Sequence, residues 1–129
     1  MDSGNRVARI LVILGTVVLL LSVTLHTFAS QKVAFPALAA SNLSSGMQAA
    51  LRVVFVSVGW HWLVIAVVTL IALFAQSRAG KMIVLVCGLA TLLEAVGGAF
   101  SMGIFIGNEM IGAAGLLILL GAVLLKTHG

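Results

Sequence analysis

Residues 53–75 read VVFVSVGWHWLVIAVVTLIALFA, and this apolar stretch decides the fold. Its only polar interruptions are Ser57, His61 and Thr69. A helix that crosses a bilayer needs roughly 20 predominantly apolar residues, and this run is long enough. A transmembrane strand would instead show about ten residues of alternating polarity, whereas this run is continuous. The stretch therefore predicts a membrane-spanning helix.

The composition extends this expectation to the whole chain. Of its 129 residues, 62% are hydrophobic and only 8% are charged, whereas soluble domains carry roughly 25% charged residues. The mean hydropathy is +1.28. We therefore predict an all-α integral membrane protein: a compact bundle of four transmembrane helices in a single domain, residues 1–129. The expected helices are about 7–29, 47–75, 82–101 and 103–125, with an external connector over residues 30–46.

The basic residues predict the orientation of these helices. Five lie before the first helix, between the second and third, or after the fourth, and only two lie on the opposite side. The excess of Lys and Arg on one side predicts that both termini are cytoplasmic, as in a bacterial-type inner (plasma) membrane. These charges form no stripe of the kind that nucleic acid requires, so we expect no nucleic-acid partner. The two sets are Arg6, Arg9, Arg78, Lys81 and Lys126, and Lys32 and Arg52.

The ends of the first helix leave two questions open. Its basic start and small-residue end also resemble a secretory signal peptide, but its apolar run exceeds the usual 7 to 15 residues, so we expect a retained helix. In the connector, Pro36 should push Phe35 out of the helical region, and the serines of residues 41–45 should cap the second helix. We expect a short turn or half-helix there, acting as a lid or as a connector at the lipid surface.

Ionisable side chains inside the predicted helices mark a candidate site. His61 lies eight residues after Val53, and Glu94 lies seven before Ser101, so both are roughly 10 to 12 Å below the outer helix ends. A charged side chain at mid-bilayer costs about 2.5 to 3.5 kcal/mol on insertion scales, and such residues usually find a polar partner. We therefore expect Glu94 to pair with His61, with His26 nearby in the outer half.

Helical spacing suggests which residues accompany this pair. Thr91 precedes Glu94 by three residues, and Ser57 precedes His61 by four, so each pair shares one face of its helix. The two tryptophans are turned about 100° from His61, and at least one should contact lipid. The candidate binding or proton-handling residues are His61, Glu94, His26, Arg52, Trp60, Trp62, Glu109, Ser57 and Thr91.

Several kinds of chemistry remain as hypotheses for these residues. A b-type haem would need His61 and His26 as its axial pair, and a zinc or copper ion would need His26, His61 and Glu94. Neither has the spacing of a known motif. No catalytic constellation is evident, and the lone Cys87 excludes a disulfide within the chain. We therefore expect a protein that is not an enzyme and holds no cofactor.

Two functions follow from these observations. The first is proton-responsive binding or transport of a small solute, in which protonation of Glu94 and His61 changes its affinity. The second is a non-catalytic accessory or assembly subunit of a larger membrane complex, or a homo-oligomer. In the second case the His61 and Glu94 pair would only lock two helices together, as interhelical hydrogen bonds do.

Overall fold

The computed structural model describes residues 3–126, which form helices joined by short turns, without a strand. Four helices are long and apolar enough to cross a membrane, which confirms the predicted all-helical class and indicates a membrane protein. A single π-helical turn, η1, joins the helices α1 and α2 into one continuous rod over Ser3–Ala39. The segments are α1 (Ser3–Ala29), η1 (Ser30–Ala34), α2 (Phe35–Ala39), α3 (Ser45–Ala75), α4 (Arg78–Met102) and α5 (Ile106–Leu124).

The first helix is longer than the sequence suggested. It runs on to Ala39, so the connection to α3 spans only residues 40–44. The expectation that Pro36 would displace Phe35 is wrong, because Phe35 keeps helical angles of φ −69 and ψ −40. Proline inside a helix clashes with the carbonyl four residues earlier, here that of Lys32. The wider π-helical turn lies around that carbonyl and lets the helix continue through the proline.

Side-chain caps and residues with positive φ mark the starts and ends of α3 and α4. The Ser44 hydroxyl accepts a hydrogen bond from the backbone N–H of Met47, which confirms the predicted serine cap of α3. The Ser77 hydroxyl caps α4 in the same way. Gln76 has a positive φ of 50 and ends α3, and Gly103, with φ 81, ends α4. The turns between α3 and α4 and between α4 and α5 are therefore tight.

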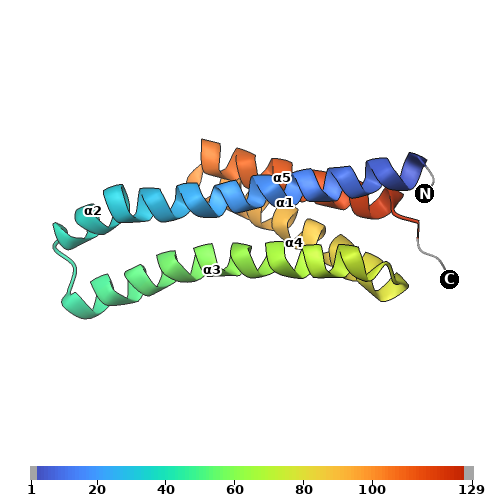
Figure 1. The fold of residues 1–129 in the computed structure, drawn as a ribbon. Helices are drawn as coiled ribbons and strands as arrows, with labels where there is room; N and C mark the ends of the chain where they lie inside the picture. Colours follow the sequence, from blue (N-terminus) through green and yellow to red (C-terminus); the bar gives the residue numbers. More distant parts are fainter. Residues whose placement is uncertain (1–2, 127–129) are drawn as a thin grey trace.

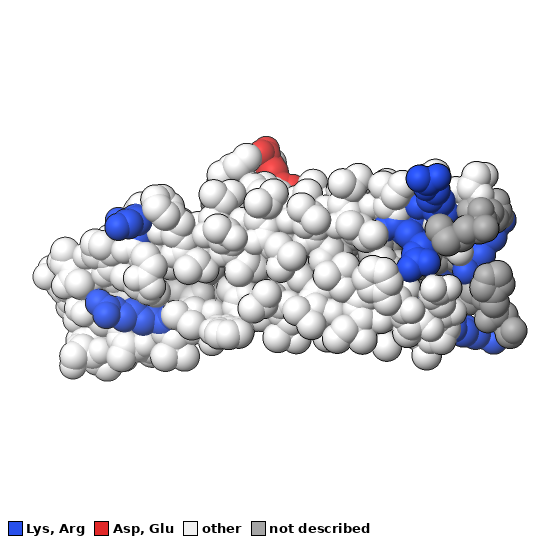
Figure 2. All heavy atoms as spheres, in the orientation of Figure 1, with Lys and Arg blue, Asp and Glu red and all other residues white. Residues whose placement is uncertain are grey.

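The four spans form one bundle in which the two halves of the chain differ in length (Figure 1). The α1–α2 rod and α3 make a long antiparallel pair, and the shorter α4 and α5 pack along only part of it. The start of α1 and the end of α5 lie together, where the Lys126 backbone N–H reaches the Asn5 side chain. We call this the terminal end, and we call the end that holds residues 40–44 the connector end. Lys and Arg side chains gather at these two ends (Figure 2).

Glycines let the helix backbones approach closely in the terminal half. A Cβ atom on Gly15 of α1 would lie 2.8 Å from the Ala114 carbonyl oxygen of α5. On the other side of α5, a Cβ atom on Gly115 would lie 2.6 Å from the Leu92 backbone nitrogen of α4. Small residues at helix interfaces allow this kind of packing in membranes. The helix α5 therefore packs closely against both α1 and α4 in this half of the bundle.

Candidate functional site

The carboxyl group of Glu94 on α4 is held from α3 by two side chains. The indole nitrogen of Trp62 donates a hydrogen bond of 3.0 Å to Oε1. The Nε2 atom of His61 lies 3.5 Å from Oε2. The sequence predicted that His61 and Glu94 meet, and they do. The indole, however, makes the shorter contact, and the sequence argument did not identify it.

The two tryptophans lie on different sides of α3. Trp62 is buried with 7% of its surface exposed, whereas Trp60 is 63% exposed. Trp60 is therefore the tryptophan whose surface is open to the surroundings of the bundle. The side chains of Ser57 and His61, which the sequence placed on one face of this helix, are both exposed. The inward face is made by Trp62 and its helical neighbours such as Ile65, and His61 reaches Glu94 from the edge of the helix.

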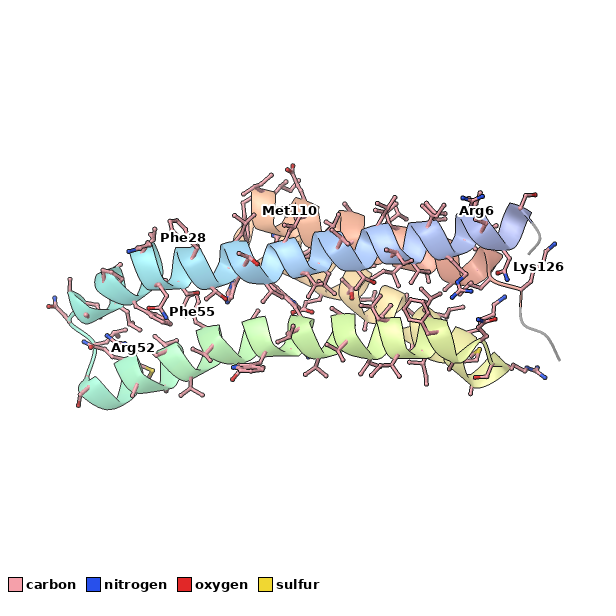
Figure 3. All side chains as sticks on the ribbon, viewed as in Figure 1. Arg6, Phe28, Arg52, Phe55, Met110 and Lys126 are labelled. Atoms are coloured by element: carbon pink, nitrogen blue, oxygen red, sulfur yellow. The ribbon has the colours of Figure 1, made fainter. Side chains whose placement is uncertain are left out.

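His26 of α1 packs against the indole ring of Trp62. Its ring meets Trp62 edge to face, with centroids 5.1 Å apart, and stacks on Phe55 at 6.1 Å. Its Nε2 atom lies 2.8 Å from the Phe55 carbonyl oxygen. A carbonyl only accepts, so this nitrogen carries the hydrogen. Figure 3 shows Phe55 between the α1 and α3 ribbons.

This arrangement does not fit the haem or metal hypotheses. The Nε2 atoms of His26 and His61 are already engaged, by the Phe55 carbonyl and by Glu94, so they do not face each other as an axial pair. Within residues 3–126, no three His, Cys, Asp or Glu side chains converge as metal ligands would. The predicted grouping of His26, His61 and Glu94 around a metal ion is therefore not formed.

A cavity of about 860 Å³ opens beside this group, toward the connector end. Its size falls within the range of ligand pockets, roughly 300 to 1,000 Å³. Residues of α1, η1, α3, α4 and α5 form its walls, most of them apolar or glycine. Glu94 is the only carboxylate in this lining. The polar residues of the lining are Ser22, His26, Ser30, Trp62, Glu94, Ser101 and Asn108.

Two lining residues were missed by the sequence argument. Asn108 is 7% exposed, and its amide donates to the Gly103 carbonyl at 2.9 Å. Ser30 is 5% exposed, and its hydroxyl has no hydrogen-bond partner. The sequence gave no signal for either residue. Asn108 stands beside Glu109, and Ser30 follows the expected end of the first helix, so both resembled ordinary helix-end residues.

The other predicted site residues lie away from the cavity. Thr91 is fully buried, and its hydroxyl donates to the Cys87 carbonyl one turn earlier. Arg52 lies with its guanidinium 5.6 Å from the Phe35 ring centre, far along α3 from His61. Glu109 is exposed in the first turn of α5, where a negative charge complements the helix dipole. None of these three lines the cavity, and neither do His61, Ser57 and Trp60.

Comparison of the chain with protein-family models, curated proteins and solved structures found no match. The ligands that the site can bind are therefore inferred from the positions of its own side chains. A carboxylate offers about four acceptor positions, and the indole and the imidazole occupy one oxygen each. Glu94 can accept a further hydrogen bond from a donor group placed in the cavity.

Proposed function

We propose that this protein binds a small, mainly apolar solute in the cavity and that Glu94 anchors its polar end. The observation that carries the proposal is the Glu94 carboxyl at the wall of an apolar cavity, oriented by Trp62 at 3.0 Å. A few well-placed polar groups in an apolar pocket are typical of ligand sites. The solute should carry a hydroxyl or amine, because an ionised carboxylate only accepts hydrogen bonds.

We propose further that proton uptake by the site changes the affinity for this solute. Imidazoles titrate between about pH 5 and 8, and such changes drive many pH sensors. The titratable groups around Glu94 are His61 on α3 and His26 on α1, and α5 contributes only neutral residues to the cavity lining. A change in the charge of either imidazole alters the field at the carboxyl that receives the solute.

The packing favours binding over transport in this conformation. The cavity reaches toward the connector end, while close backbone contacts at Gly15 and Gly115 close the terminal half. Transport would require α5 to move away from α1 or α4. With the orientation predicted from the basic residues, the cavity faces the outer side of a bacterial-type inner membrane and both termini are cytoplasmic.

The test compares two carboxyl-to-amide variants in nanodiscs. The Trp60→Phe substitution leaves Trp62 as the single tryptophan whose fluorescence reports binding. The substitution should not disturb the site, because Trp60 does not line the cavity. Octylamine, 1-octanol and octanoate are titrated from pH 5 to 8, which varies the head group on one apolar body. We expect the amine and the alcohol to bind more tightly than octanoate, with an affinity that depends on pH.

Glu94→Gln should keep the fold and abolish this pH dependence, because an amide preserves size and hydrogen bonding but carries no charge on which the two imidazoles can act. The matched control is Glu109→Gln, which removes an exposed carboxylate outside the cavity and should behave like the parent. A Glu94→Gln variant with the pH profile of the parent would refute the proton-responsive part. No binding of any octyl probe to the parent would refute the site itself.

A second function, as a subunit of a larger membrane complex, draws on the turn between α4 and α5. Phe100 is 89% exposed and Ile104 79% exposed, more than the other large apolar residues of the described chain. Such a protruding apolar tip suits a protein partner or a second copy. Native mass spectrometry of the protein extracted from membranes would support this function if a defined complex is lost in a Phe100→Ser, Ile104→Ser double variant.

A further inference from the structure

Ser30 and Thr69 carry the two buried hydroxyls of the described residues that have no hydrogen-bond partner, and of these two only Ser30 lines the cavity. Six serine and threonine hydroxyls donate to the carbonyl four residues earlier, which is the common way to satisfy a hydroxyl inside an apolar helix. Ser30, at the start of the π-helical turn, has no such bond although it is 95% buried. The six that do are Thr16, Ser22, Thr24, Thr27, Thr91 and Ser101.

Ser30 lines the same cavity as Glu94, and a rotation about its Cα–Cβ bond is needed to turn its buried hydroxyl toward a ligand. A buried polar group without a partner is costly, and native proteins rarely leave one unless a ligand or water completes it. Ser30 also begins a π-helical turn, a feature that recurs at functional sites. Ser30 is therefore a second polar point in a cavity whose first polar point is the carboxyl of Glu94.

The two points are separated along the bundle. Ser30 lies one turn beyond His26 on the same rod, roughly 6 Å at 1.5 Å per residue. The His26 ring contacts Trp62, whose indole in turn reaches Glu94. Ser30 and Glu94 therefore lie on different helices, with the rings of His26 and Trp62 between them along this series of contacts. Apolar side chains of the lining, such as those of Leu25 and Val58, occupy the wall beside them.

The edge of the cavity is apolar as well. Val33, Val54 and Met102 line it and are 67%, 57% and 69% exposed. Val33 and Val54 lie within two residues of Lys32 and Arg52, which are basic residues of the kind that extend to lipid headgroups. No Lys or Arg lines the cavity. The entrance is therefore suited to a molecule that arrives from the lipid rather than from water.

We propose that the ligand is an elongated apolar molecule with a hydrogen-bonding group at each end. The deep group donates to Glu94, and the shallow group pairs with the hydroxyl of Ser30. This inference rests on the proposed binding function and adds the ligand class to it. Ser30 selects molecules with two polar ends over molecules with one.

The test uses pairs of probes that differ only in the second polar group: 8-amino-1-octanol against octylamine, and 1,8-octanediol against 1-octanol. Binding is followed through Trp62 in the Trp60→Phe background, with protein-free nanodiscs to correct for lipid partitioning. One additional hydrogen bond should give the two-ended probe about a fivefold advantage in the parent. A six- to ten-carbon series should show an optimum length.

Ser30→Ala should remove this advantage while octylamine binds as before. It should also leave the ligand-free thermal stability unchanged or slightly raised, because the hydroxyl has no partner to lose. The matched control is Thr27→Val, which removes a hydroxyl from the same rod outside the cavity lining and should keep the advantage.

The outcomes separate the inference from the function on which it rests. If octylamine binds in a Glu94-dependent way but the second polar group gives no advantage, the inference fails and the proposed function stands. An advantage that survives Ser30→Ala also overturns it, as does a loss of ligand-free stability in that variant. If no octyl probe binds, the proposed function fails as well.

Discussion

Replacement of Gly115 by alanine should destabilise the bundle. The new Cβ atom would lie 2.6 Å from the Leu92 nitrogen, 2.9 Å from the Leu92 Cα atom and 3.1 Å from the Gly88 carbonyl oxygen. All three are backbone atoms of α4, so no side-chain rotation can relieve the overlap, and the two helices have to separate. Overpacking of this kind typically costs about 1 to 3 kcal/mol.

Gly112 on the same helix provides the control. A Cβ atom there would meet only the Ala95 Cβ atom at 3.5 Å, an ordinary van der Waals contact. Both substitutions gain the same helix propensity, about 0.5 to 1 kcal/mol relative to glycine, so this contribution cancels between them. Gly115→Ala should therefore be less stable than Gly112→Ala by about 1 to 3 kcal/mol.

The measurement is the free energy of unfolding of both variants in the same detergent, followed by the helical circular dichroism signal during titration with SDS. Equal stabilities of the two alanine variants would refute the close approach of α4 and α5. That result would also remove the argument that the terminal half is closed, and with it the preference for binding over transport.

Two further predictions concern the orientation of the chain in the membrane and the contacts of Glu94. In a Cys87→Ala background in intact cells, Asn42→Cys should react with a membrane-impermeant maleimide and Ala79→Cys should not; the reverse pattern would invert the orientation. Trp62→Phe should lower the free energy of unfolding by about 1 kcal/mol for the lost hydrogen bond, while Trp60→Phe should change it by less than about 0.5 kcal/mol at its exposed position. Equal effects of the two tryptophan variants, measured by the same SDS titration, would show that the contact with Glu94 contributes nothing.

The number of spans and the pairing of His61 with Glu94 could be predicted because both depend on position along the helix. Hydropathy marks the segments that can lie in lipid, and a rise of 1.5 Å per residue then gives the depth of each polar side chain. Two ionisable residues at equal depth on neighbouring helices have a strong reason to meet, since a polar partner lowers the cost of placing them in lipid. The predicted proximity followed from this argument.

The direction in which each side chain points was harder to predict. The helix α3 is apolar around its whole circumference, so its sequence contains no contrast that marks the buried face. The sequence argument grouped Ser57 with His61 on one face but did not say which face is buried, and packing buries the large indole of Trp62 while both smaller polar side chains stay exposed. Ser30 escaped detection because its burial depends on the helix continuing through Pro36.

The packing that closes the terminal half also explains why a cavity forms at the connector end. Close contacts fix α5 against α1 and α4 through Gly15 and Gly115. Toward the connector end, the Asn108 side chain occupies the space over Gly98, where a Cβ atom would lie 2.8 Å from its Oδ1 atom. Its amide is bonded to the Gly103 carbonyl, so the asparagine is held in place between the two helices.

The cavity therefore follows from the fixed positions of its walls. Asn108 and Gly98 both line it, so the residues that join α4 to α5 also shape the space beside them. Glu94 lies one turn from Gly98 on the same helix, which sets the position of its carboxyl relative to the opposite wall on α1 and η1. A ligand would then find the Glu94 carboxyl already placed by Trp62 and His61, and would lose little free energy in ordering it.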